Sequence, residues 1–188
     1  MEHAPTTTNQ HEHRPNPDTP RIYVACLSAY NNGRLHGRWL HANQPTGALY
    51  EEVRDMLKNS PVPGAEEWAI HDYENFAGIG VGEYAPLDHI TQVAAGVAEH
   101  GGAFAGWASE QPVGEATIEA FEDAYLGSWP DTAAYGEDLI NDLGDPLQEV
   151  PDWIRPYVRI DTKQLGQDAS SSLNTISGAD GQVHLFDP

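Results

Sequence analysis

Hydrophobic and polar residues alternate in the first third of the chain and predict a small antiparallel sheet. The alternation covers residues 21–26 and resumes over 35–40, with the turn signal Asn31-Asn32-Gly33 between them, as in a β-hairpin. Apolar residues then follow helical spacing over 46–58, and residues 66–73 have the pattern of a third strand. These segments together predict a small α+β unit.

Helical spacing dominates the middle of the chain. It predicts helices from Pro86 to Gly101-Gly102, over 104–109, over 114–125 and over 131–143. Glycines directly follow the first and the last of these helices, as is common at helix ends because glycine readily adopts a positive φ.

The two ends of the chain have different patterns. A short helix is expected after Tyr157, followed by a strand over 172–176, a turn, and a last strand over 183–186. Residues 1–20 are polar, contain four prolines and show no periodicity, which predicts a disordered tail. The chain as a whole is therefore expected to be α+β.

The net charge argues against several classes of function. The 188 residues include 29 Asp and Glu but only nine Lys and Arg, a formal net charge of −20. Proteins that bind nucleic acid or anionic lipid rely on Lys and Arg, so neither partner is expected. The sequence has no membrane-spanning apolar run, no signal-peptide pattern, and a single cysteine, Cys26. A cytoplasmic location is therefore expected.

The charge is also unevenly distributed. The 96 residues between Lys58 and Arg155 contain no Lys or Arg but 19 Asp and Glu. By contrast, the segment from Arg21 to Lys58 has five cations against three acids. Adaptation to high salt would spread acidic residues evenly, so this regional bias favours a binding surface over both salt adaptation and an ordinary solvated acidic face.

Acidic residues recur at helical spacing within the cation-free span. Glu115, Glu119 and Glu122 are expected to share one face of the helix over 114–125, with Asp123 beside them. Carboxylates at such spacing stand roughly 5–6 Å apart at Cβ, and successive phosphates of one DNA strand advance roughly 3.4 Å along the axis. The pattern is therefore comparable in scale with a DNA backbone.

Patterns typical of catalytic or metal sites are weak. His11-Glu12-His13 lies in the expected tail, and adjacent His71 and Asp72 would point to opposite faces of a strand. The glycines of 78–82 do not form a G-x-G-x-x-G motif. Abundant carboxylates leave a glycosidase open by residue type, but a sugar-binding cleft gives no reason to exclude cations. No enzyme activity, cofactor or metal is therefore expected.

Five segments, in order, resemble the ArdA antirestriction protein family. The most specific is Ala69-Ile70-His71-Asp72-Tyr73-Glu74. The others are residues 22–33, 35–40, 120–127 and 154–161, which read IYVACLSAYNNG, LHGRWL, AFEDAYLG and IRPYVRID.

This resemblance implies an elongated homodimer whose chain has three small domains. After the tail over 1–20 these would be an antiparallel-sheet N-terminal domain over 21–75, a small helical middle domain over 76–127, and an α+β C-terminal domain over 128–188. The boundaries fall at the glycine-rich loop and at an apparent break over 127–130. Such proteins are encoded on conjugative elements, imitate bent DNA and occupy the DNA-binding groove of type I restriction-modification enzymes.

The carboxylates expected to stand in for phosphates share one property, their place in the cation-free span. They are Glu66, Glu67, Asp72, Glu74, Glu83, Glu115, Glu119, Glu122, Asp123, Asp131, Glu137, Asp138, Asp142, Asp145, Glu149 and Asp152. The alternative function is an acidic adaptor or chaperone-like module that binds another basic protein.

Overall fold

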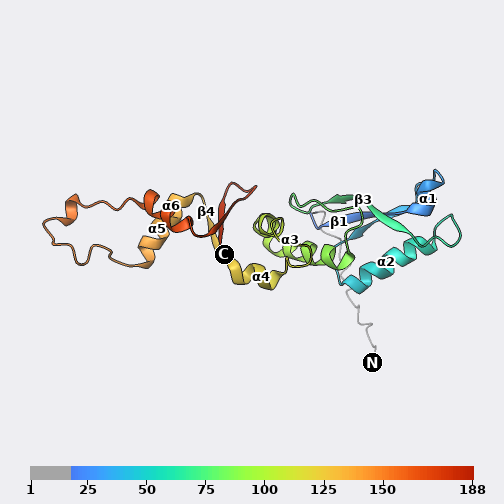
Figure 1. Ribbon diagram of the computed structural model, residues 1–188, viewed down its shortest axis with the longest axis horizontal. Coiled ribbons are helices and arrows are strands. Elements are labelled where there is room, and N and C mark those ends of the chain that lie inside the picture. The colour runs from blue at the N-terminus through green and yellow to red at the C-terminus, as the bar shows by residue number, and fades with distance from the viewer. Residues whose placement is uncertain (1–17) are drawn as a thin grey trace, which may run out of the picture.

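The computed structural model describes residues 18–188, so residues 1–17 of the tail expected over 1–20 lie outside them. The described chain contains helices and two antiparallel three-stranded sheets, which confirms the α+β class. It is elongated: the first sheet lies towards one end, helices α3 and α4 lie centrally, and α5 and α6 lie towards the other end (Figure 1). The division into three domains stays a prediction.

The first sheet has the order β2-β1-β3. Its strands are β1 (Arg21–Cys26), β2 (Gly37–His41) and β3 (Trp68–Glu74), so the predicted hairpin and third strand are confirmed. The hairpin connection differs from a simple turn, because it contains a short helix, α1 (Leu27–Asn31).

Helix α2 (Thr46–Lys58) has the predicted bounds and packs on this sheet. Its buried residues, Leu49, Val53 and Met56, follow helical spacing and join the core formed by the strands. Pro20 falls within the expected tail, yet it is buried, and its carbonyl accepts a hydrogen bond from the Ala42 amide at 2.9 Å. Pro20 therefore extends the pairing of β1 with β2 by one residue before Arg21.

Helix α3 (Leu87–Ala108) contains the predicted break at Gly101, where φ is 59° and ψ is −134°. The break lets the second half of α3 fold back, so that the ring of Phe104 lies against Gly96. A Cβ atom at Gly96 would overlap that ring. Glycine is therefore required at 96 for close packing and is favoured at 101 by the backbone.

Helix α4 (Ile118–Ala124) is shorter than the helix predicted over 114–125. The Thr117 hydroxyl caps its first turn by accepting a hydrogen bond from the Ala120 amide at 3.0 Å. The expected break over 127–130 is wrong, because β4 (Tyr125–Trp129) follows α4 at once and pairs with β6 (Val183–Phe186). Long-range pairing thus overrides the local turn signal of Gly127 and Pro130.

The second sheet has the order β4-β6-β5, with β5 spanning Asn174–Ser177. A group of aromatic rings connects this sheet with α3 and α4, and adjacent ring centroids lie 4.9–6.5 Å apart. Its members are Phe104, Trp107, Phe121, Tyr125 and Phe186.

The last helices, α5 (Thr132–Asp142) and α6 (Thr162–Ser170), pack together through glycines. A Cβ atom at Gly136 would overlap the Thr162 carbonyl oxygen, and one at Gly166 would overlap that of Thr132. A long loop with the 3₁₀ helix η1 (Arg155–Tyr157) connects the two helices. Across the described residues, no helix is long and apolar enough to span a membrane.

Candidate functional site

The carboxylates of the cation-free span reach solvent along much of the chain. Every predicted phosphate stand-in is exposed except Glu74, which is partly buried. We use the name acidic surface for the exposed carboxylates between Lys58 and Arg155, which come from the β3 region, α3, α4, α5 and the loop before η1.

Few of these carboxylates have a cationic partner. Glu74 pairs with Arg21, Glu122 lies 3.6 Å from the His100 ring nitrogen, and Asp145 and Asp152 pair with Arg155. The other predicted stand-ins form no ion pair within residues 18–188; they are Glu66, Glu67, Asp72, Glu83, Glu115, Glu119, Asp123, Asp131, Glu137, Asp138, Asp142 and Glu149. Most of the negative charge of the acidic surface is therefore not neutralised by ion pairs.

Near β3, two carboxylates affect the protonation of a neighbouring tyrosine, Tyr84. The pKa of the Tyr84 hydroxyl is raised above its ordinary value, first by its hydrogen bond to Glu83 and then by the negative charge of Glu83, with a smaller effect of Glu67. An anionic phenolate is disfavoured beside carboxylates. The structure therefore brings Glu67 and Glu83 close enough to act on one group, although they are far apart in the sequence.

On α4 the acidic face is smaller than predicted. Glu119, Glu122 and Asp123 lie on the helix at i, i+3 and i+4. Glu115 precedes the helix, where its amide donates to the Pro112 carbonyl at 3.0 Å, so the proposed i, i+4, i+7 row is wrong. The reason is the Thr117 cap, which starts the helix only at Ile118.

On α5 the acids occupy both ends of the helix. Asp131 caps the N-terminus, and its side chain accepts a hydrogen bond from the Ala134 amide at 2.9 Å. Asp138 accepts from the Trp129 indole at 3.2 Å, which orients its carboxylate. Glu137 and Asp142 are exposed, and Asp142 ends the helix one turn beyond Asp138.

The loop before η1 is organised by a single cation. Arg155 lies 3.3 Å from Asp145 and 3.7 Å from Asp152, and it donates hydrogen bonds to the carbonyls of Gln148 and Val150. One guanidinium therefore fixes both the backbone and two carboxylates of a loop that otherwise presents acids to solvent.

Three further acids belong to the acidic surface but are missing from the predicted set. Asp88, Glu99 and Glu110 are exposed and lie on or directly after α3. Their position in the cation-free span is the sequence signal that identifies them.

His71, Asp72 and Cys26 each contact neighbouring residues of the first sheet and its loops. Asp72 accepts from the Tyr73 amide at 2.8 Å, while the His71 ring lies edge-on to Tyr30 with centroids 4.9 Å apart. Cys26 is buried and lies 3.3 Å from the Ser60 hydroxyl. His11-Glu12-His13 lies outside the described residues.

The glycine-rich loop over 78–82 packs on α3. Its residues Ile79 and Val81, with Ile90, Val93 and others, line an apolar cavity of about 280 Å³. Apart from His89, the side chains that line this cavity are apolar.

Comparison with known proteins connects this architecture to a family. The family model described as antirestriction protein (ArdA) matches residues 22–184, which include the whole acidic surface and all of both sheets except the first residue of β1 and the last two of β6. The search of curated proteins gave no match. The family match covers far more than half of the chain, and the chain therefore belongs to the ArdA family of antirestriction proteins.

Proposed function

We propose that this protein acts as a DNA mimic: its acidic surface occupies the DNA-binding groove of a type I restriction-modification enzyme and thereby keeps DNA out. The observation that supports this most strongly is the row of exposed, mostly unpaired carboxylates in a 96-residue span without Lys or Arg. Solubility alone needs a net charge of only ~2–8. A surface that imitates a phosphate backbone must also exclude cations, because any cation repels the Lys and Arg of a DNA-binding groove.

The local spacing of the carboxylates supports the same proposal. Asp138 and Asp142 on α5, and Glu119 and Asp123 on α4, stand one helical turn apart. Such pairs lie roughly 5–6 Å apart at Cβ. A groove built to contact successive phosphates meets negative charge at a similar interval.

The shape of the chain extends this local match. The acidic residues occur from β3 to the loop before η1, and these elements follow one another along the long axis in Figure 1. An elongated body with charge along its length suits a groove that normally holds a duplex. A homodimer would double the length of the charged surface, and we include it in the proposal.

The mechanism is competition and requires no bond to be made or broken. The attraction is the sum of many exposed charge interactions, each worth only ~0.2–1 kcal/mol. The proposed setting is the cytoplasm, where DNA entering with a conjugative element would otherwise be cut by the restriction enzyme of the cell.

A displacement experiment tests the proposal. A purified type I restriction-modification enzyme is bound to a labelled duplex that contains its recognition site, and the full chain is titrated in at moderate salt. We expect displacement at near-stoichiometric amounts of protein. Higher salt should weaken the complex, with a shallower dependence than for DNA because the mimic releases fewer condensed counterions.

Two outcomes would overturn the proposal. If the labelled duplex stays bound even at low salt, the acidic surface does not compete for the DNA-binding groove. If the protein instead binds isolated basic proteins equally well, the acidic adaptor or chaperone-like function becomes the better account. A salt dependence as steep as that of DNA would contradict the counterion argument.

A further inference from the structure

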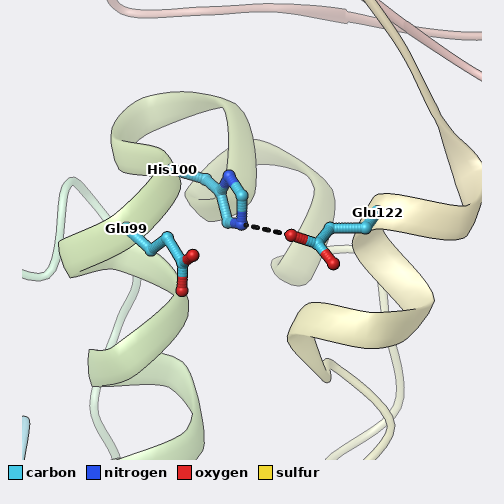
Figure 2. Close-up of side chains that lie close together, drawn as sticks. All are labelled: Glu99, His100 and Glu122. Atoms are coloured by element: carbon cyan, nitrogen blue, oxygen red, sulfur yellow. Dashed lines mark ion pairs between the residues drawn. The ribbon is translucent and has the colours of Figure 1, made fainter.

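Two helices bring together three potential metal ligands that are separated in the sequence. Glu99 and His100 end the first half of α3, directly before the break at Gly101, and Glu122 lies on α4. One ligand atom from each residue lies within 4.8 Å of the other two. Figure 2 shows a nitrogen of the His100 ring directed at the Glu122 carboxylate, with the Glu99 carboxylate on the opposite side of that nitrogen in this view.

The His100 ring is held in place by packing. It lies on the Phe121 ring with centroids 4.7 Å apart, and its side chain is only 22% exposed. Its Nε2 atom is buried and has no hydrogen-bond partner within the described residues. Burying a polar atom without a hydrogen bond costs free energy, and a bound ligand at this nitrogen would remove that cost.

The nearest group does not meet that need as a hydrogen-bond acceptor. Nε2 lies 3.6 Å from a Glu122 carboxylate oxygen, whereas charged hydrogen bonds are about 2.7–2.9 Å long. Two ligands about 2.0–2.2 Å from a tetrahedral Zn²⁺ ion stand roughly 3.4 Å from each other. The His100–Glu122 separation is thus closer to that of two ligands of one ion, whereas the Glu99 oxygen, within 4.8 Å of both atoms, has to move closer to join them.

The donor set also agrees with a metal. One imidazole and two carboxylates are ligands that Zn²⁺ takes in proteins, with water at a remaining position. The two carboxylates balance the charge of a divalent cation, and the surrounding span contains no Lys or Arg to compete for them.

We propose that Glu99, His100 and Glu122 bind a divalent transition-metal ion, with Zn²⁺ the best match. The ion would connect the bend of α3 to α4 and so fix the direction in which the chain continues into the second sheet. Glu99 and Glu122 also belong to the acidic surface, but metal binding can be measured without a restriction enzyme.

The test is calorimetric titration of Zn²⁺ into the full chain after treatment with a chelator. The background variant His11→Ala/His13→Ala removes the imidazoles of the N-terminal His-Glu-His sequence. Excess Mg²⁺ occupies acidic sites that use oxygen ligands alone. We expect one Zn²⁺ per chain under these conditions and a rise in the unfolding temperature.

Ligand variants distinguish this site from general attraction to acids. Glu122→Gln should weaken Zn²⁺ binding at least about a hundredfold, since even outer partners of metal ligands contribute about 10–100-fold. Glu122 is exposed, so the variant should fold. The matched control is Glu119→Gln, which removes an equal charge from the same helix and should leave Zn²⁺ affinity unchanged.

Cobalt provides a second measurement. Co²⁺ in the same site should give visible absorption bands that shift when His100→Gln removes the nitrogen ligand. If Glu122→Gln and His100→Gln bind Zn²⁺ as tightly as the background protein, or if Mg²⁺ prevents Zn²⁺ binding, the site does not exist. If the protein binds Zn²⁺ as predicted but does not displace DNA from a restriction enzyme, the proposed function is wrong and the metal site still stands.

Discussion

The first sheet and the α5–α6 pair differ in what holds them together. The sheet and α2 enclose an apolar core that includes Ile22, Val24 and Leu49, all fully buried. In α5 and α6 the buried residues are Gly136, Gly166 and Ser170, so backbone contact replaces side-chain burial. Apolar residues of the connecting loop, such as Trp153 at 75% exposed and Tyr157 at 84%, lie in solvent.

The two regions also differ in charge. Near the first sheet, Arg21 pairs with Glu74 and Arg54 pairs with Glu51. From α5 to η1 the carboxylates outnumber the single cation, Arg155. Of these two regions, the one with a single cation among its carboxylates has the smaller apolar core. Its stability must therefore depend on a few specific contacts, and these can be tested one at a time.

The largest expected effect is that of Gly166→Ala. The new Cβ atom would overlap the Thr132 carbonyl oxygen, which is backbone and cannot turn away. We expect a loss of about 3 kcal/mol in the free energy of unfolding of the α5–α6 pair, the upper range for overpacking. Urea unfolding and hydrogen exchange would measure it.

A glycine in the contrasting region gives the control. Gly47 lies on α2 with nothing within 4 Å of the Cβ position, so Gly47→Ala should stabilise α2 by roughly 0.5–1 kcal/mol. If both variants unfold like the parent protein, close backbone contact does not hold α5 and α6 together.

The next effect is that of Arg155→Gln. It removes contacts to Asp145, Asp152 and two carbonyls, so the loop before η1 should lose about 1–2 kcal/mol of local stability. Hydrogen exchange over residues 145–158 should become faster. Lys163→Gln removes an equal charge from α6 without breaking an ion pair in the described chain, and similar exchange in both variants would contradict the role given to Arg155.

The smallest expected effects come from the two ends of α5. Asp131→Ala should cost about 1 kcal/mol because it removes the N-cap. Asp142→Asn should stabilise the helix by about 0.5 kcal/mol, since a negative charge at the C-terminus opposes the helix dipole and repels Asp138. Each variant removes one negative charge, yet thermal unfolding should show a lower unfolding temperature for Asp131→Ala and a higher one for Asp142→Asn. Shifts in the same direction would contradict the cap and dipole argument.

The sequence predicted the elements whose periodicity is strong. Thr46–Lys58 has the predicted bounds because its apolar stripe, its proline neighbours and its burial agree. The break at Gly101 was also predictable, since adjacent glycines interrupt a helical pattern. The helix predicted over 131–143 is observed as α5, with Asp131 as its N-cap.

Elements that depend on distant partners were missed. β4 contains Gly127 and precedes Pro130, and only its pairing with β6 makes it a strand. Likewise, the run of residues without Lys or Arg revealed the acidic surface, but the approach of Glu122 to Glu99 and His100 depends on how α4 packs against the bend of α3. A sequence pattern shows local periodicity and charge, but it does not show which distant residues come close together in the folded chain.

The most direct test of distributed mimicry is the displacement assay repeated with graded neutralisation. Six exposed glutamates without ion pairs in the described structure would be changed to Gln in steps of two; they are Glu66, Glu67, Glu83, Glu115, Glu137 and Glu149. The control, Glu51→Gln/Asp55→Asn, removes two charges from α2, outside the acidic surface.

The account predicts a stepwise loss of affinity for the type I enzyme, roughly 0.2–1 kcal/mol per carboxylate, and little change in the control. A single substitution that abolished DNA displacement, or six that left it unchanged, would contradict the claim that many separate carboxylates together imitate DNA.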